Sequence, residues 1–269
     1  MRISVRGLPA DDAHAAIDAA FEEIAAIHRL MSFHEADSDV SRLNREARCG
    51  AVSVDFRTFE VLSRAREMSA MSAGAFDITV APTLVRRGAL PEPSGAPAPD
   101  PDADWRDIEL LAGGRVRFRK PLWFDLGGIA KGYAVDRAIG VLARFAPAQA
   151  CVNAGGDLRV CGRERIALDL GDSNAFVDLE NGALASSSGV ITGRSDHGEG
   201  THIDPAGDYT ARRFVSVAAP SCIDADALTK IVMARGAASA EILARCGATA
   251  YAFDDAIGWQ RIAELPRCA

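Results

Sequence analysis

The sequence predicts an α+β protein in which mixed sheets pack against helices. Three patterns indicate this fold class: helical periodicity near the amino end, many short alternating segments in the second half, and no regular strand–helix–strand rhythm. The 269 residues, 48% of them apolar and 25% charged, suffice to bury a hydrophobic core. We expect a single domain over residues 1–269.

The first half predicts one short strand and three helices. Residues 2–6 alternate like a strand, and Asp11 or Asp12 then caps a long helix whose apolar positions continue to Met31. Further helices are expected at 40–47 and at about 58–71. Residues 88–104 are rich in Pro, Gly, Ala and Asp, which predicts an extended surface loop.

The second half predicts mostly strands. Gly113 and Gly114 separate two alternating segments, which is typical of a β-hairpin. A strand is expected to end at Asp125 and a helix to begin near Ile129. Strands are then expected at 150–154, 158–162, 165–170, 175–179, 183–188 and 213–219, helices at about 226–234 and 238–245, and a strand pair at the end of the chain.

Charge and cysteine spacing exclude several classes of protein. A net charge of -7 disfavours a nucleic-acid surface, because phosphate backbones attract clustered cations. The six cysteines form no CxxC pair, so we expect no zinc or redox motif. Cys151 and Cys161 lie in apolar strand-like segments, where we expect reduced, buried thiols. The amino end has no apolar signal region and no stretch could span a bilayer. As the sequence stands, we expect a cytoplasmic protein; a trimmed export signal would instead imply a periplasmic or membrane-anchored one.

The segment WFDLGGIAKGYAVDRA, residues 123–138, carries the strongest chemical signal. Two glycines permit a tight turn into a helix, where exposed N–H groups and the ammonium of Lys131 would attract phosphate. Asp136, further along the helix, could accept hydrogen bonds from a ribose or a base. The structural alternative is an ordinary helix start with glycines chosen for close packing. The chain contains only three lysines, which favours a function for Lys131.

Four other polar segments each have an ordinary structural explanation. They are MSFHEADSDVSRLN (31–44), GAFDITVAPTL (74–84), THIDP (201–205) and DADALTK (224–230). Taken singly, they are explained by a capped turn, a paired buried acid, a surface histidine and acidic residues at a helix start.

Together, and in this order, the segments resemble the FAD:protein FMN transferase (ApbE) family. The matching motifs are MSxxxxxSxxSRLN, GxFDxTV, DLGGIAKGYAVD, NAGGD (153–157), ALASSSG (183–189), HIDP and ADAL, and they extend from about residue 30 to 235. The resemblance implies two closely associated lobes with FAD between them. It also implies an enzyme that cleaves FAD, releases AMP and attaches FMN to a Thr or Ser of an acceptor flavoprotein domain.

The resemblance also implies a set of site residues. The adenine and ribose would contact Met31, Ala75, Phe76 and Asp77, and the phosphates and sugar would contact Lys131 and Asp136. The base that deprotonates the incoming hydroxyl would be His202. Mg²⁺ would be held by Asp226 and the backbone carbonyl of Ala130.

One position departs from the family pattern. Members carry a threonine metal ligand four residues after the aspartate of ADAL, whereas this chain has Lys230 there and Thr229 just before it. Positions 226 and 230 share one face of a helix, so we expect Lys230 to pair with Asp226 or to reach the FAD phosphates. The alternative is a helix shifted by one residue, with Thr229 as the ligand.

Two other functions use the same motifs. A pyrophosphatase would hydrolyse FAD to FMN and AMP, and a non-catalytic FAD-binding protein would have lost its metal. Lys230 is the residue that favours the second of these alternatives.

Overall fold

The computed structural model describes residues 1–170, 173–188, 214–254 and 258–262, and confirms the α+β prediction. The chain divides into two compact units. The first comprises Met1–Ala25 and the described residues from Lys131 onward, and the second comprises Ala26–Ala130. No helix in the described ranges is long and apolar enough to cross a bilayer.

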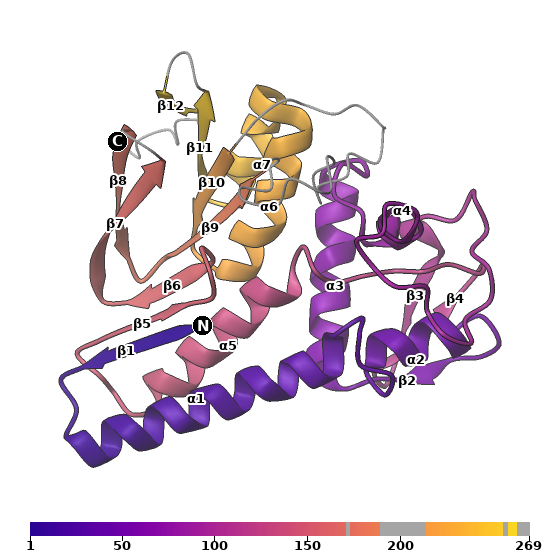
Figure 1. Cartoon of the computed structure of the whole chain (residues 1–269), viewed down its shortest axis with the longest axis horizontal. Helices are drawn as coiled ribbons and strands as arrows, with labels where there is room; N and C mark the ends of the chain where they lie inside the picture. The colour runs from indigo at the N-terminus through magenta and orange to yellow at the C-terminus, as the bar shows by residue number, and fades with distance from the viewer. Residues whose placement is uncertain (171–172, 189–213, 255–257, 263–269) are drawn as a thin grey trace. The chain divides into compact units, whose positions relative to one another are not determined.

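The first unit contains a seven-stranded sheet (Figure 1). Its strand order is β1-β5-β6-β9-β10-β11-β12, and every neighbouring pair is antiparallel. The strands are β1 (Arg2–Arg6), β5 (Gln149–Asn153), β6 (Leu158–Cys161), β9 (Ala183–Ser188), β10 (Phe214–Ala219), β11 (Thr249–Asp254) and β12 (Gly258–Arg261).

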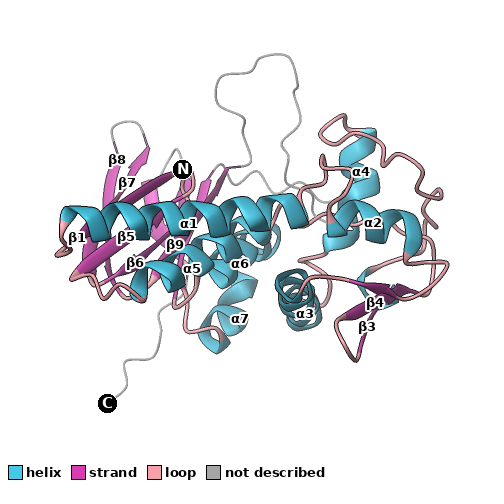
Figure 2. Cartoon of the chain, turned by 90° about the horizontal axis from the view of Figure 1, so that it is seen from below, coloured by secondary structure: helices cyan, strands magenta, loops and turns pink. Residues whose placement is uncertain are grey.

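The two faces of this sheet pack against different elements. Ala150 and Val152 of β5 join a buried cluster with residues of α1 (Ala10–Met31) and α5 (Ala130–Ala143). Cys151, between them in sequence, packs on the opposite face with the hairpin of β7 (Arg163–Leu170) and β8 (Ser173–Glu180). Successive side chains of a strand point to opposite faces, so helices cover one face and the hairpin the other (Figure 2).

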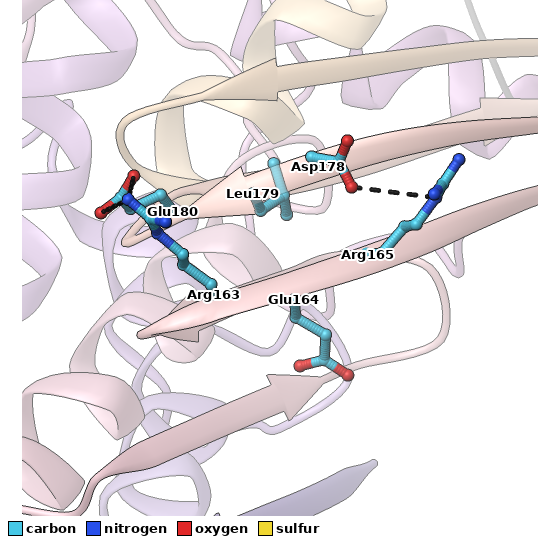
Figure 3. A pocket seen from close by; sticks show the side chains of 6 residues that line it. All are labelled: Arg163, Glu164, Arg165, Asp178, Leu179 and Glu180. Atoms are coloured by element: carbon cyan, nitrogen blue, oxygen red, sulfur yellow. Dashed lines mark hydrogen bonds and ion pairs between the residues drawn. The ribbon is translucent and has the colours of Figure 1, made fainter.

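An open pocket on the β7–β8 hairpin is lined by side chains that pair across the two strands (Figure 3). Arg163 lies 2.9 Å from Glu180, and Arg165 lies 3.8 Å from Asp178. Exposed ion pairs of this kind contribute little to stability. None of the residues assigned to FAD or Mg²⁺ lines this pocket.

Helices and a small sheet make up the second unit. The sheet has the order β2-β4-β3, with β2 (Val52–Ser53), β4 (Arg115–Phe118) and β3 (Ile108–Leu111). Gly113 and Gly114 join β3 to β4 with φ of 75° and 66°, which confirms the predicted hairpin. The predicted helices are α2 (Asp39–Glu46) and α3 (Phe56–Met71).

The strand expected to end at Asp125 is absent from the described structure. Residues 119–125 are irregular, because single long-range partners satisfy their backbone groups. The Asn44 amide bonds both the N–H and the carbonyl of Phe124, at 3.0 and 3.1 Å, and Asp125 N–H donates to Ile78. These hydrogen bonds satisfy the backbone at Phe124 and Asp125 without the pairing of a neighbouring strand.

Two short helices that the sequence pattern did not predict follow Asp77. They are the 3₁₀ turn η1 (Ile78–Val80) and α4 (Ala81–Arg86). Asp77 caps η1, and Pro82 lies in the first turn of α4, where proline is favoured. We expected only an apolar run here, and did not recognise the Asp77 cap of η1 or the helix-start signal of Pro82.

Cys151 and Cys161 are free thiols, as predicted. Burial raises the pKa of Cys151 to about 12, and the neighbouring Glu164 adds to that increase. Cys151 is therefore protonated at neutral pH, the form in which a thiol is a poor nucleophile.

Close packing explains one glycine of the GGIAKG segment. A Cβ on Gly132 would lie 2.7 Å from the carbonyl carbon of Cys222 and 2.9 Å from Cβ of Asp226. Both contacts belong to α6 (Cys222–Arg235), so Gly132 permits α5 and α6 to approach closely.

We expect Gly132→Ala to lower the free energy of unfolding by about 1–3 kcal/mol, because the added methyl group would push α6 away from α5. Gly140→Ala is the matched control in the same helix, since Gly140 is exposed and has no neighbouring atom within 4 Å. It should raise stability by about 0.5–1 kcal/mol through helix propensity. Urea unfolding of the two variants measures both effects. Equal stability changes would show that Gly132 is not a packing constraint.

Candidate functional site

A carboxylate on another helix fixes the start of α6. Asp136 of α5 accepts hydrogen bonds from the N–H groups of Cys222 and Ile223 at 2.8 and 2.9 Å. Arg159 donates to the same carboxylate at 2.7 Å. Burial raises the pKa of Asp136, although these backbone hydrogen bonds and Arg159 act in the opposite direction. Asp136 therefore caps α6 from outside, and α6 begins at Cys222 rather than near 226 as expected.

Four charged side chains meet between α5, α6 and the sheet in the first unit. We call Lys131, Asp157, Asp226 and Lys230 the charged cluster. Lys131 Nζ lies 2.7 Å from Asp157 Oδ2, and Lys230 Nζ lies 2.5 Å from Asp226 Oδ1. Two ammonium groups thus balance two carboxylates.

Asp226 is completely buried and both its oxygens have partners. Lys230 contacts Oδ1, and Gly132 N–H donates to Oδ2 at 3.1 Å. This confirms the expected pairing of positions 226 and 230 on one helix face. The Gly132 N–H is thereby used within the protein and does not point at a ligand.

Thr229 is also buried, but the partners of its hydroxyl among the described residues do not include the Asp226 carboxylate. Its hydroxyl donates to the backbone carbonyl of Asp226 at 2.7 Å and pairs with Ser187 Oγ at 2.7 Å. Ser187, at the end of β9, also accepts from Lys230 at 3.2 Å. The helix is therefore not shifted in the way that would place Thr229 beside the carboxylate.

Lys131 is the more accessible of the two cations in the cluster. Its side chain is 44% exposed, whereas that of Asp157 is 1% exposed. Burial alone would lower the pKa of Lys131, but the carboxylates of Asp157 and Asp226 outweigh burial and raise it. Asp157 Oδ2 pairs with Lys131 and has no other hydrogen-bond partner among the described residues.

Sequence reasoning missed Asp157 and Ser187 as members of this site. The motif NAGGD contained the signal: Asn153 Oδ1 accepts from the N–H groups of Gly155 and Gly156, whose φ values are 75° and 106°. That turn places the buried Asp157 directly before β6. Burial raises the pKa of Asp157, and the charge of Asp226 raises it further, whereas Lys131 and Lys230 lower it.

Comparison with known proteins identifies the family. The model of the ApbE family matches residues 1–253. This chain belongs to the ApbE family. It is 28% identical over 257 residues to the FAD:protein FMN transferase of Treponema pallidum (strain Nichols), covering 82% of this chain and 71% of that protein. It is 27% identical over 248 residues to that of Haemophilus influenzae, covering 80% and 70%.

Solved structures of ApbE proteins share the fold. The apo flavinyl transferase ApbE of Pseudomonas stutzeri superposes with a TM-score of 0.80 at 22% identity, over 96% of this chain and 89% of that one. The flavin transferase ApbE of Vibrio cholerae gives 0.75 at 24% identity, over 96% and 91%.

Five of the remaining residues assigned through the ApbE resemblance belong to the second unit. Met31 ends α1, and Ala75, Phe76 and Asp77 form the turn before η1, all in the second unit. Ala130 begins α5. His202 lies outside the residues that the structure describes, so its placement stays a prediction.

The turn that contains Asp77 is held by hydrogen bonds. Ser72 Oγ accepts from Phe76 N–H at 3.0 Å, and Asp77 Oδ1 accepts from the N–H and hydroxyl of Thr79 at 2.8 and 2.7 Å. Burial nevertheless raises the pKa of Asp77, more than Thr79 lowers it.

Since the folded pKa of Asp77 is above its unfolded value, ionising this group destabilises the fold as pH rises through that interval. We expect Asp77→Asn, which keeps an acceptor for Thr79, to gain stability relative to the wild type between about pH 4 and about pH 7. Urea unfolding of both proteins at the two pH values measures the difference. A difference that does not grow with pH would contradict the burial effect.

Proposed function

We propose that this chain is an FAD:protein FMN transferase. It would cleave the pyrophosphate of FAD, release AMP and join FMN through a phosphoester to a Thr or Ser of an acceptor flavoprotein domain. The observation that carries the proposal is the ApbE match over residues 1–253, together with relatives named for that activity along about the same length.

Lys131 is the group best suited to bind the pyrophosphate. It lies in the first turn of α5, where the helix dipole favours negative charge, and its ammonium is partly exposed. An ammonium has three donors, and Asp157 faces only one of them. Asp157 therefore orients Lys131 and leaves it capacity to contact phosphate oxygens.

Asp136 has a different role from the one that the resemblance implies. Both its oxygens already accept hydrogen bonds from α6, and Arg159 pairs with one of them. We assign to it the positioning of α6 and hence of the charged cluster. The adenine and ribose remain assigned to Met31, Ala75, Phe76 and Asp77 on the resemblance.

The transfer itself is a displacement at phosphorus. The acceptor hydroxyl loses its proton to a base, its oxygen bonds the FMN phosphorus, and AMP departs with the electrons of the broken bond. The base assigned by resemblance is His202, since imidazole titrates near neutral pH.

Mg²⁺, which the resemblance implies, does not fit the residues present. Both oxygens of Asp226 are engaged, one of them by an ammonium, and the Thr229 hydroxyl is directed to Ser187 and to a backbone carbonyl. We therefore derive no step through a metal ion.

Incubation with FAD and an acceptor flavoprotein domain tests the proposal. A transferase releases AMP and adds the mass of FMN to the acceptor. AMP with free FMN and an unmodified acceptor would indicate a hydrolase, and neither product would indicate a binding protein.

Lys131→Ala should weaken FAD binding by about 10- to 100-fold, since a charge-assisted hydrogen bond to phosphate is lost. Lys131→Arg should also be impaired, because a planar fork does not replace a compact ammonium beside Asp157. Calorimetry with FAD measures both, and Lys120→Ala, outside the cluster, is the control. Unchanged affinity in Lys131→Ala would place the phosphates elsewhere.

His202→Ala should reduce FMN transfer by about 10²- to 10⁴-fold and leave FAD affinity nearly intact, because a general base acts on the acceptor hydroxyl. Single-turnover transfer and FAD calorimetry separate the two effects. Wild-type transfer in this variant would show that another group is the base.

A further inference from the structure

Lys230 is a cation built into the charged cluster. Its side chain is 21% exposed, its Nζ contacts Asp226 Oδ1, and it donates to Ser187 at 3.2 Å. It also acts on Asp157, where it opposes the rise in pKa that burial and Asp226 cause. One ammonium thus compensates charge on both buried acids.

Both carboxylate oxygens of Asp226, beside Lys230, already have partners. The completely buried Asp226 has Lys230 on one oxygen and Gly132 N–H on the other. A divalent cation at this carboxylate would have to displace an ammonium, and the two cations would repel each other at contact distance. Thr229 offers no replacement, because its hydroxyl bonds Ser187 and a carbonyl.

We propose that the ammonium of Lys230 takes the place of a divalent cation in this chain, so that FMN transfer proceeds without one. The inference rests on the proposed function. In the transfer, the acceptor oxygen–phosphorus bond forms and the phosphorus–oxygen bond to AMP breaks. The hydroxyl proton passes to a base, and AMP keeps the bonding electrons.

The hydrogen-bonding capacity of Lys230 suits this role. Two of its three N–H donors have acceptors among the described residues, namely Asp226 and Ser187. The third donor can meet a phosphate oxygen. Lys131, which pairs with Asp157 and also interacts with Asp226, then supplies a second ammonium to the same pyrophosphate.

The wild-type protein tests the proposal directly. FMN transfer to an acceptor flavoprotein domain is measured in EDTA and in Mg²⁺, and Mn²⁺ binding is followed separately by electron paramagnetic resonance. We expect equal transfer rates in the two media and no stoichiometric Mn²⁺ binding. Transfer that EDTA abolishes and Mg²⁺ restores would overturn the proposal, as would one tightly bound Mn²⁺.

Substitutions at Lys230 provide a second, independent measurement. Lys230→Thr removes the ammonium and supplies a hydroxyl on the same helix face as Asp226, so Mn²⁺ should bind at least about tenfold more tightly than in the wild type. Transfer by this variant should become dependent on Mg²⁺. Lys230→Arg keeps the charge and should not gain Mn²⁺ binding, and Lys120→Thr controls for loss of a lysine elsewhere.

The outcomes separate this inference from the proposed function. Transfer that requires Mg²⁺ would contradict the inference that Lys230 replaces a divalent cation, and would leave the transferase assignment in place. Absence of AMP and of modified acceptor under all conditions would contradict the transferase assignment. The Mn²⁺ titrations would still decide whether Lys230 occupies the cation position. If Lys230→Thr does not fold, the wild-type measurements decide alone.

Discussion

The buried carboxylate of Asp226 imposes the main constraint on this site. A carboxylate without contact to water needs a counter-charge and hydrogen-bond donors, or it strongly destabilises the fold. Lys230 supplies the charge and Gly132 N–H supplies a donor. Because Gly132 belongs to α5, satisfying Asp226 also requires α5 and α6 to lie in contact, and only a residue without a Cβ permits that distance.

Asp136 and Arg159 enforce the same contact from another direction. The carboxylate of Asp136 caps the first turn of α6, so α6 cannot rotate or slide along α5 without losing two backbone hydrogen bonds. Arg159 on β6 links this cap to the sheet. The register of α6 is thus set by side chains on α5 and β6, which places Lys230 and not Thr229 beside the carboxylate of Asp226.

Local sequence patterns predicted what local interactions determine. The periodicity of α1 and the Gly113–Gly114 hairpin lie within short windows of sequence, and both are confirmed. Two of the errors fall where a distant side chain replaces a local partner. Asn44 satisfies the backbone at Phe124 from 80 residues away, and Asp136 caps Cys222 across 86 residues, so neither the missing strand nor the early start of α6 was visible locally.

In the candidate site, too, local spacing predicted some contacts and others depend on distant parts of the chain. Helical spacing alone predicted the pair of Asp226 and Lys230, because positions four apart share a face. The place of Asp157 depends on a glycine turn followed by pairing of β6 with β9, where Ser186 N–H donates to its carboxylate at 3.3 Å. Only the folded sheet brings that acid to Lys131. The motif NAGGD was recognised as a family feature, but its role in charge balance required the structure.

The charge of the cluster connects Lys230 to substrate binding. With two lysines and two aspartates, the cluster is formally neutral before any ligand arrives. A threonine at 230 with a bound divalent cation would leave it one unit positive, since the metal adds two charges where the lysine adds one. The ammonium of Lys230 therefore attracts a pyrophosphate less strongly than a bound divalent cation would. It is covalently part of the chain, however, so its presence does not depend on the metal concentration or on a metal-binding equilibrium. It follows that FAD affinity in this chain depends more heavily on Lys131, the more exposed of the two ammonium groups.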